Sequence, residues 1–288
     1  MKDILFIVNP VLTAKFKQSI ETTISDGLSD SGLTFDIKFS EYHRHAVEIT
    51  QNNLDSYSVF CAVGGDGTVN QVSSMLINTD KTLGIIPFGS GNGLANYLKL
   101  PKDINDSLDR IKRQKTITID SGTINNKHFI NLAGIGFDAY IAHQFAKSKS
   151  RGFLIYIKET IKALFTYKTK EYLFFLDDVR KHVKAFLICL CNSNQFGNSA
   201  IICPHAKIDD SLITVCILKP FPFYSMPFLV YRLFKGNIDK SDYIEFIECR
   251  EGVIKNEGKI NIQVDGEPEI IEGDLKIKVV PKSIKIII

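Results

Sequence analysis

Val59-Phe60-Cys61-Ala62-Val63-Gly64-Gly65-Asp66-Gly67-Thr68-Val69-Asn70 is the segment from which the rest of the chain can be interpreted. It begins with an apolar run that does not alternate with polar residues, which predicts a strand buried on both faces, as in a parallel sheet. A glycine-rich turn follows, and apolar residues over 69–76 then recur at helical spacing. A strand, a turn and a helix in this order direct backbone N–H groups and the positive end of a helix dipole at an anion.

The composition of this turn suggests chemistry as well as shape. Glycine suits it because a Cβ would block the close approach of a phosphate and would disfavour a positive φ. Asp66 is the exception, since a carboxylate among phosphate-binding N–H groups makes sense if a metal ion or a substrate hydroxyl also binds there. A tight turn capped by an aspartate is the alternative. A Walker P-loop is excluded because no Gly-Lys-Ser/Thr follows.

Length and composition indicate a soluble globular protein. The 288 residues suffice for one large or two ordinary domains, and 44% hydrophobic with 23% charged residues is a typical balance. A net charge of +3 is too small to indicate nucleic-acid binding. We find no signal peptide and no apolar run of membrane-spanning length. The six cysteines include no Cys-x-x-Cys, so we expect reduced core cysteines in a cytoplasmic protein rather than disulfides or a metal site.

Strand and helix patterns alternate over the first part of the chain. Apolar runs predict buried strands at Ile4–Val8, Val59–Val63 and Leu83–Ile86, alternating apolar residues predict a half-buried strand at Leu33–Phe39, and helical spacing lies between them. A second glycine loop, Pro87–Gly93, follows the last of these strands. Repeated βα units predict a parallel sheet with right-handed crossovers, whose ligands bind at the carboxyl ends of the strands, where both glycine loops lie.

From about residue 117 the pattern changes to short strands separated by turn residues, which predicts an antiparallel sandwich or a similar domain. The candidate strands are Ile117–Asp120, His128–Leu132, Tyr172–Leu176, Val183–Cys191, Leu212–Leu218, Tyr243–Glu248, Ile260–Val264, Leu275–Val280 and Ile284–Ile288.

Two segments interrupt these strands. Phe153–Phe165 is amphipathic, and Phe221–Phe234 is crowded with aromatic residues between Lys219 and Lys235. An aromatic segment with basic flanks suits an anionic membrane surface or the mouth of an apolar substrate site. An ordinary buried helix is the equal alternative.

Motifs along essentially the whole chain resemble, in order, those of the diacylglycerol kinase and sphingosine kinase superfamily of lipid kinases. They are Asn9-Pro10, Gly64–Asn70, Pro87–Asn92, Phe129–Ala139, Pro204–Ala206 with Asp209-Asp210, and Val264–Glu267. NAD kinases and phosphofructokinases carry a similar first glycine loop, so the ordered set is what identifies the superfamily.

The resemblance implies an α/β plus all-β fold. A Rossmann-like parallel-sheet domain, similar to those of NAD kinases and phosphofructokinases, would bind the nucleotide over 1–122 with a returning strand at 281–288. An antiparallel β-sandwich domain over 123–280 would bind the lipid substrate. The implied reaction is transfer of the γ-phosphoryl group of ATP, with Mg²⁺, to a hydroxyl of diacylglycerol or a sphingoid-type lipid in the cleft between the domains.

The resemblance also assigns roles to residues of this chain. Those implied to bind ATP are Asn9, Pro10, Gly64, Gly65, Gly67, Thr68, Asn70, Gly89, Ser90 and Asn92. Asp66 is our first choice for the base that deprotonates the acceptor, as in sphingosine kinases, and Asp265 is the rival base, as in bacterial members. Glu267 would assist catalysis, and Asp66, Glu267 and Asp210 are the candidate Mg²⁺ ligands.

Asp120 and Asp138 are implied to meet the lipid headgroup or to order a metal–water network, with turn or cap aspartates as the alternative. Three departures from the superfamily pattern bear on activity. Gly93 replaces an acidic residue, Gln71 replaces a common glutamate, and Lys207 lies near the place of a structural Mg²⁺ ligand. Gly93 and Gln71 leave a catalytically weak lipid- or nucleotide-binding regulator as an alternative, and the shared fold and first glycine loop leave an NAD kinase-like enzyme as another.

The expected partners follow from the same reasoning. We expect a lipid substrate, a peripheral membrane surface at the inner face, no nucleic acid, and a cytoplasmic location. An exposed strand edge in the second domain is a candidate for pairing with a second copy of the chain.

Overall fold

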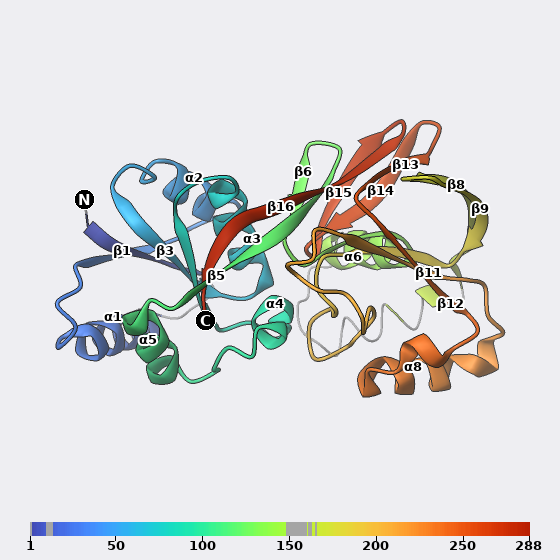
Figure 1. The fold of residues 1–288 in the computed structure, drawn as a ribbon. Coiled ribbons are helices and arrows are strands. Elements are labelled where there is room, and N and C mark those ends of the chain that lie inside the picture. The colour runs from blue at the N-terminus through green and yellow to red at the C-terminus, as the bar shows by residue number, and fades with distance from the viewer. Residues whose placement is uncertain (1, 10–13, 148–159, 161–162, 165) are drawn as a thin grey trace. The chain divides into compact units, whose positions relative to one another are not determined.

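The computed structural model describes residues 2–9, 14–147, 160, 163–164 and 166–288 (Figure 1). The chain forms two compact units, one of residues 1–119 with 282–288 and one of residues 120–281. We call them unit 1 and unit 2. Most of the predicted segment Phe153–Phe165 lies outside the described residues.

Unit 1 is built on a parallel sheet in the order β2-β1-β3-β4-β16. The strands are β1 (Lys2–Val8), β2 (Phe35–Phe39), β3 (Tyr57–Gly64), β4 (Thr82–Pro87) and β16 (Leu275–Ile287). Every residue of β4 and nearly every residue of β3 is buried, as the non-alternating apolar runs predict for a sheet covered on both faces.

Helices cover both faces of this sheet (Figure 1). They are α1 (Ala14–Leu28), α2 (His45–Gln51), α3 (Asp66–Leu76), α4 (Gly93–Tyr97) and α5 (Ile104–Arg113). Apolar residues of α1 and α5 form one core with β1 and β3, and α2 packs with α3 across the other face. The predicted α/β architecture of the first part of the chain is therefore confirmed.

The end of the chain is one long strand instead of the two predicted ones. β16 runs without a break through Pro281 and Lys282, where φ is 48°. Its first part pairs antiparallel with β13 (Glu251–Lys255), and its last part pairs parallel with β4, with Ile286 opposite Leu83. Because proline cannot donate to a ladder and a left-handed residue bends the backbone, this point suits an exchange of partners within a single strand.

Unit 2 is a sandwich of antiparallel strands, also as predicted. One sheet has the order β12-β11-β10-β7-β14-β15. Its strands are β7 (Leu132–Gly136), β10 (Leu187–Cys191), β11 (Ile213–Leu218), β12 (Ile244–Cys249), β14 (Lys259–Val264) and β15 (Glu267–Glu272). Facing it are β8 (Lys170–Leu176), β9 (Val179–Ala185), β13 and residues 275–278 of β16, and the hairpin of β5 (Thr116–Ile124) and β6 (Lys127–Phe129). A core that includes Phe174, Leu190 and Ile277 joins the two layers.

The second face of the six-stranded sheet is covered by helices. These are α6 (Phe137–Lys147) and α8 (Met226–Lys235), with the short 3-10 helices η1 (Phe223–Ser225) and η2 (Ile238–Lys240). All six cysteines of the chain are free and buried. In the described part of the chain, no helix has the length and apolar character needed to cross a membrane.

Two predicted strands were wrong in extent. His128–Leu132 is split between β6 and β7, and Val183–Cys191 between β9 and β10. At the second break, the Phe186 N–H donates to Leu218 O at 2.7 Å, while its carbonyl accepts from Phe137 N–H at 3.0 Å. The backbone N–H and carbonyl of Phe186 thus bond to residues far away in the sequence. The spacing of apolar residues cannot reveal such partners.

Candidate functional site

The first glycine loop joins β3 to α3 in unit 1. Gly64 ends the strand, and a Cβ placed on it would lie 2.5 Å from Thr68 Oγ1 and 2.8 Å from Thr68 Cβ. Asn9 Nδ2 donates to Thr68 Oγ1 at 2.9 Å, so the end of β1 orients the threonine. Glycine is required at residue 64 because the first turn of the helix folds back against it. Pro10 lies outside the described residues.

The second glycine loop follows β4 and is closed by its own asparagine. The Gly89 N–H donates to Asn92 Oδ1 at 2.9 Å, and Asn92 Nδ2 donates to Gly89 O at 2.7 Å. Asn92 is buried in a left-handed conformation, with φ of 52°, which asparagine tolerates better than most residues. Ser90 is exposed at the tip of the loop. Asn92 thus holds the loop together, and Ser90 is available to a ligand.

The two loops touch through backbone atoms. The Phe88 N–H donates to Gly64 O at 2.8 Å, and a Cβ on Gly89 would lie 2.4 Å from Gly65 Cα. Gly65 itself has an extended backbone with φ of −93°, so it is needed for close approach and not for a positive φ. Glycines at 65 and 89 therefore allow the loops that follow two neighbouring strands to lie against each other. We call these two glycine loops, with the first turn of α3, the cradle.

This contact yields a prediction for Gly89→Ala. We expect the added methyl to separate the loops, to lower the free energy of unfolding by about 1–3 kcal/mol, and to weaken nucleotide binding. Ser56→Ala is the matched control, because Ser56 is an exposed residue directly before β3 and lies outside both glycine loops. Thermal unfolding and a nucleotide-binding titration test this, and unchanged nucleotide affinity in Gly89→Ala would contradict it.

Asp66 lies where the two loops and two helices meet. It is the first residue of α3, and its Oδ1 accepts a hydrogen bond of 2.7 Å from the N–H of Gly93, the first residue of α4. Burial raises the pKa of Asp66, and hydrogen bonds from the backbone of Gly93 and Asn92 oppose this rise. Gly93, which we noted as a lost acidic residue, therefore contributes its N–H to the carboxylate of Asp66.

The cradle fits a phosphate chemically. Gly67 and Thr68 lie in the first turn of α3, where N–H groups lack intrahelical acceptors and the helix dipole is positive, and Asn70 follows them with a polar side chain. Thr68 is buried, and Gly67 and Asn70 are partly exposed. A Cβ at residue 64 would collide with Thr68, and one at residue 89 would collide with Gly65. These residues suit a nucleotide phosphate.

In unit 2, Asp265 forms the tight turn between β14 and β15. Asp265 and Gly266 both have positive φ, of 47° and 88°, as in a two-residue hairpin of the Asp-Gly type. Its Oδ2 accepts from the N–H of Ile130, and its Oδ1 accepts from those of Asn131 and Leu132, all at 2.9 Å. Both carboxylate oxygens of this buried side chain therefore hold the segment between β6 and β7 in place.

Glu267 follows this turn and begins β15, opposite Val264. Its side chain is partly exposed, unlike that of Asp265. Of the two acidic residues of the Asp-Gly-Glu motif, Glu267 is thus the one more open to a cation or phosphate.

Asp138 is the second residue of α6, which packs beside the same hairpin. Its Oδ2 accepts from Gln263 Nε2 at 2.7 Å, and Gln263 Oε1 accepts from the Gly266 N–H at 2.7 Å. Gly134 leaves room for this pair, since a Cβ there would lie 2.0 Å from Asp138 Oδ2. Burial raises the pKa of Asp138 to about 6, although the bond from Gln263 lowers it.

The raised pKa predicts a pH-dependent cost of keeping Asp138 ionised. The carboxyl of Asp138 binds its proton more tightly in the folded state than in the unfolded state. The free energy of unfolding therefore falls as the pH rises from about 4 to about 6, and it stays at the lower value above pH 6. We expect Asp138→Asn to be more stable than the native chain by roughly 1–3 kcal/mol at neutral pH and equal to it near pH 4. Denaturant unfolding across pH measures the difference. A difference that does not change with pH would refute the assignment.

Asp120 and Asp210 form a second acidic group in unit 2. Asp120 is fully buried, and its Oδ2 accepts from the Ser211 N–H at 2.6 Å. Asp210 is exposed, and desolvation, with smaller contributions from Glu248 and Asp120, raises its pKa. Ser211 has φ of 61°, a left-handed conformation that is uncommon for serine, and its N–H is held by Asp120.

Two asparagines link these acidic groups. Asn192 Nδ2 donates to the carbonyls of Asp120 and Ile130, at 2.9 and 2.7 Å. Asn131, whose N–H binds Asp265, accepts at Oδ1 from Ser193. Sequence reasoning missed Asn192 and Gln263 as site residues. The only available signal was a polar residue at the end of a predicted apolar strand, which is a weak one.

The predicted site residues thus form two groups. Asn9, Asp66 and the glycine loops come together in unit 1, and Asp120, Asp138, Asp210, Asp265 and Glu267 lie in unit 2. Among the described residues, no three His, Cys, Asp or Glu side chains are arranged to hold a metal ion. Mg²⁺ is commonly held by one or two carboxylates together with substrate phosphates, so Asp66 or Glu267 would suffice when a nucleotide is bound.

Comparison with known proteins places this site in a family. The diacylglycerol kinase catalytic domain matches residues 3–124, and the YegS C-terminal NAD kinase beta sandwich-like domain matches residues 131–288. A protein of Chromohalobacter salexigens named "Probable lipid kinase YegS-like" is 32% identical over 216 residues, which are 72% of this chain and 68% of that protein. The chain belongs to the YegS-like lipid kinase family.

Other members of the family match over nearly the full length. A Streptococcus pneumoniae protein provisionally named a lipid kinase is 26% identical over 93% of this chain and 92% of its own. A solved structure from Bacillus anthracis, provisionally named a diacylglycerol kinase, has a TM-score of 0.82 at 22% identity and covers 99% of this chain and 97% of its own. This last likeness confirms the fold, and the motif-based resemblance is confirmed by the family matches.

Proposed function

We propose that this family member is an ATP- and Mg²⁺-dependent kinase that transfers the γ-phosphoryl group to a hydroxyl of a lipid. The observation that carries the proposal is Asp66, a carboxylate with a raised pKa held between two helix N-termini and two glycine loops. Such a place brings together phosphate-binding N–H groups and a proton acceptor. The names of the relatives support a lipid as the acceptor.

In this proposal, Mg²⁺ bound with ATP would neutralise charge that develops on the transferred phosphoryl group. The protein would supply position: the first turn of α3 holds phosphate, Asn9 orients Thr68, and Asn92 keeps the second loop closed. Asp66 would accept the proton of the attacking hydroxyl. A carboxylate suffices for this because the transition state is loose and the proton leaves late.

Asp66 is a better candidate for the base than Asp265. The Gly93 N–H donates to Asp66 Oδ1 at 2.7 Å, with a further backbone bond from Asn92, whereas three N–H groups hold the two oxygens of the buried Asp265 at 2.9 Å. A carboxylate whose oxygens already accept several hydrogen bonds binds a proton less readily, because those bonds stabilise its charged form. We therefore assign Asp265 to positioning, and Glu267 beside it to Mg²⁺ or phosphate.

The deciding experiment is phosphate transfer from γ-labelled ATP in the presence of Mg²⁺. The acceptors are diacylglycerol, a sphingoid base and other lipid alcohols in mixed micelles, with NAD as a separate acceptor. Label in a lipid supports the proposal and names the acceptor class. Label in NAD alone would replace it with an NAD kinase-like activity. ATP binding without transfer to any acceptor would favour a regulator.

A further inference from the structure

Exposed aromatic side chains concentrate on one short segment of unit 2. Six of the eleven exposed large apolar side chains in the described part of the chain lie within residues 223–234. They are Phe223, Tyr224, Phe228, Val230, Tyr231 and Phe234, with 43–82% of their surface exposed. We call η1 and α8 with these side chains the aromatic face. Isolated exposed apolar residues need no explanation, but a contiguous group of this size marks an interaction surface.

The aromatic face is firmly held, so its exposure is not a sign of a loosely attached helix. Leu229 is buried against the six-stranded sheet, and Leu233 packs on the same core. The helix ends at Gly236 in a left-handed cap with φ of 67°. Arg232 Nη1 donates to Asn237 O at 3.1 Å just beyond it. Only one side of α8 is therefore used by the fold.

Basic residues flank the aromatic face in the sequence, and one of them, Lys219, is paired with Glu245 at 3.0 Å. From Lys219 to Lys235 the chain contains three basic residues and no acidic one. Arg232 lies over the ring of Phe228 at 4.4 Å, and Lys235 lies 5.9 Å from the ring centre of Tyr231. Cations beside exposed rings can remain in the polar headgroup layer while the rings enter the apolar layer below it.

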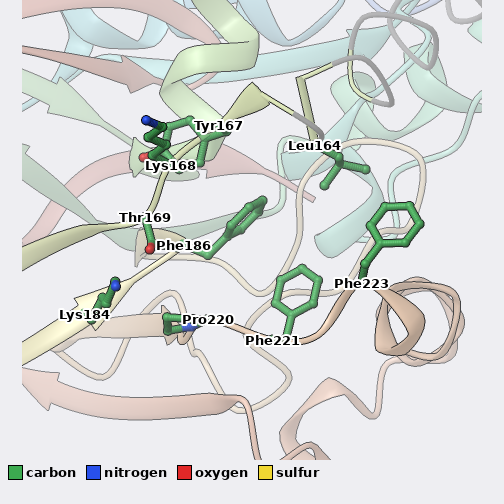
Figure 2. A pocket seen from close by; sticks show the side chains of 9 residues that line it. All are labelled: Leu164, Tyr167, Lys168, Thr169, Lys184, Phe186, Pro220, Phe221 and Phe223. Atoms are coloured by element: carbon green, nitrogen blue, oxygen red, sulfur yellow. The ribbon is translucent and has the colours of Figure 1, made fainter.

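A pocket of about 470 Å³ adjoins the aromatic face and shares Phe223 with it. Figure 2 shows Phe221, Phe223 and Leu164 on one side of the pocket and Lys168, Thr169 and Lys184 on the other. No ion pair involves Lys168 or Lys184 among the residues that the structure describes. An apolar wall next to uncompensated lysines suits an amphipathic anion.

We propose that unit 2 docks on a phospholipid bilayer that contains anionic lipid, with the aromatic face in the interface and Lys168 and Lys184 on a headgroup phosphate. Arg232 and Lys235 beside the rings, together with the two pocket lysines, favour an anionic bilayer over a second copy of the chain, which would bring identical positive surfaces together. This binding does not depend on the proposed kinase activity. It would place the protein where a lipid hydroxyl is available.

The absence of tryptophan from the chain allows a clean test. Phe228→Trp introduces a single reporter on the aromatic face, and Tyr42→Trp, at another exposed aromatic residue in unit 1, is the matched control. On mixing with phosphatidylcholine vesicles that contain phosphatidylglycerol, we expect emission of the first variant to shift to shorter wavelength and that of the control to stay unchanged. Pure phosphatidylcholine should give a much smaller shift. Equal shifts in both variants, or none in either, would overturn the proposal.

Vesicle sedimentation separates the two components of the surface. We expect Lys168→Gln with Lys184→Gln to lower partitioning onto anionic vesicles roughly tenfold and to weaken its dependence on salt. Phe228→Ser with Tyr231→Ser should lower it at least as much, whereas Ile270→Ser, at an exposed residue of β15, should not. These changes leave Leu229 in place, so thermal unfolding should be unaffected. A wavelength shift that appears without vesicles and grows with protein concentration would instead identify a second copy as the occupant and refute bilayer docking.

Discussion

Asp66→Asn is expected to lower the rate of phosphoryl transfer by about a hundred- to ten-thousand-fold while the protein remains fully folded. The amide keeps an oxygen that can accept from the Gly93 N–H, so the link between α3 and α4 survives. What the variant loses is a group that can take up a proton. The loss should appear in kcat more than in the affinity for ATP, because the N–H groups of the cradle are unchanged.

Stability provides an independent readout for the same variant. Burial raises the pKa of Asp66, so the folded state favours the protonated carboxyl, and ionisation costs stability as pH rises above the ordinary range of an aspartate. We therefore expect Asp66→Asn to unfold at the same or a higher temperature than the native chain at neutral pH. A loss of activity together with higher stability is the signature of a functional group held in an unfavourable place.

Asp106→Asn is the matched control. Asp106 also lies in the first turn of a helix of unit 1, but it is exposed and belongs to α5, away from the glycine loops. It should change neither activity nor stability appreciably. Full activity in Asp66→Asn would remove Asp66 as the base, and equal losses in the two variants would point to a general effect on helices.

Asp265→Asn is expected to lower the free energy of unfolding by roughly 2–4 kcal/mol, the largest effect on stability among these variants. Three backbone N–H groups rely on this carboxylate. An amide has one oxygen and an NH₂ group, so at least one N–H of the segment 130–132 would face a donor. A buried donor without an acceptor costs far more than an average hydrogen bond contributes.

Asparagine is the informative substitution because the backbone at residue 265 is left-handed, with φ of 47°. Asparagine and aspartate both tolerate this region, so backbone strain does not confuse the result. Asp265→Gly provides the second variant, since glycine adopts positive φ without cost and removes the acceptors altogether. Both should be destabilised in denaturant unfolding.

The two roles considered for Asp265 predict different outcomes. If it fastens the segment between β6 and β7, stability falls in both variants, and activity falls in proportion to displacement of that segment. If it is the base instead, Asp265→Asn would lose activity at unchanged stability, which is the pattern expected here for Asp66. The comparison of unfolding and kcat across Asp66→Asn and Asp265→Asn therefore assigns the base.

Local signals in the sequence were enough for the parallel-sheet half of the fold. The apolar run before Gly64 and the glycines after it specify a buried strand, a turn and a helix within a dozen neighbouring residues. Periodicity is a property of adjacent residues, so it can be recognised without knowing what each element packs against. The Asp265-Gly266 turn is equally local, since an Asp-Gly pair between strands specifies its own backbone conformation.

Contacts between distant residues required the folded chain. Nothing near Asp265 in the sequence indicates that its carboxylate binds the N–H groups of residues 130–132, and nothing near Gly89 indicates that it needs space for Gly65. The aromatic residues of 223–234 predict a buried helix and a membrane-binding helix equally well, because composition does not say which side of α8 meets the sheet. Leu229 takes the buried position, and the rings around it stay exposed. Local periodicity specifies elements, whereas the roles of Asp66, Asp265 and the aromatic face depend on the partners that long-range packing brings to them.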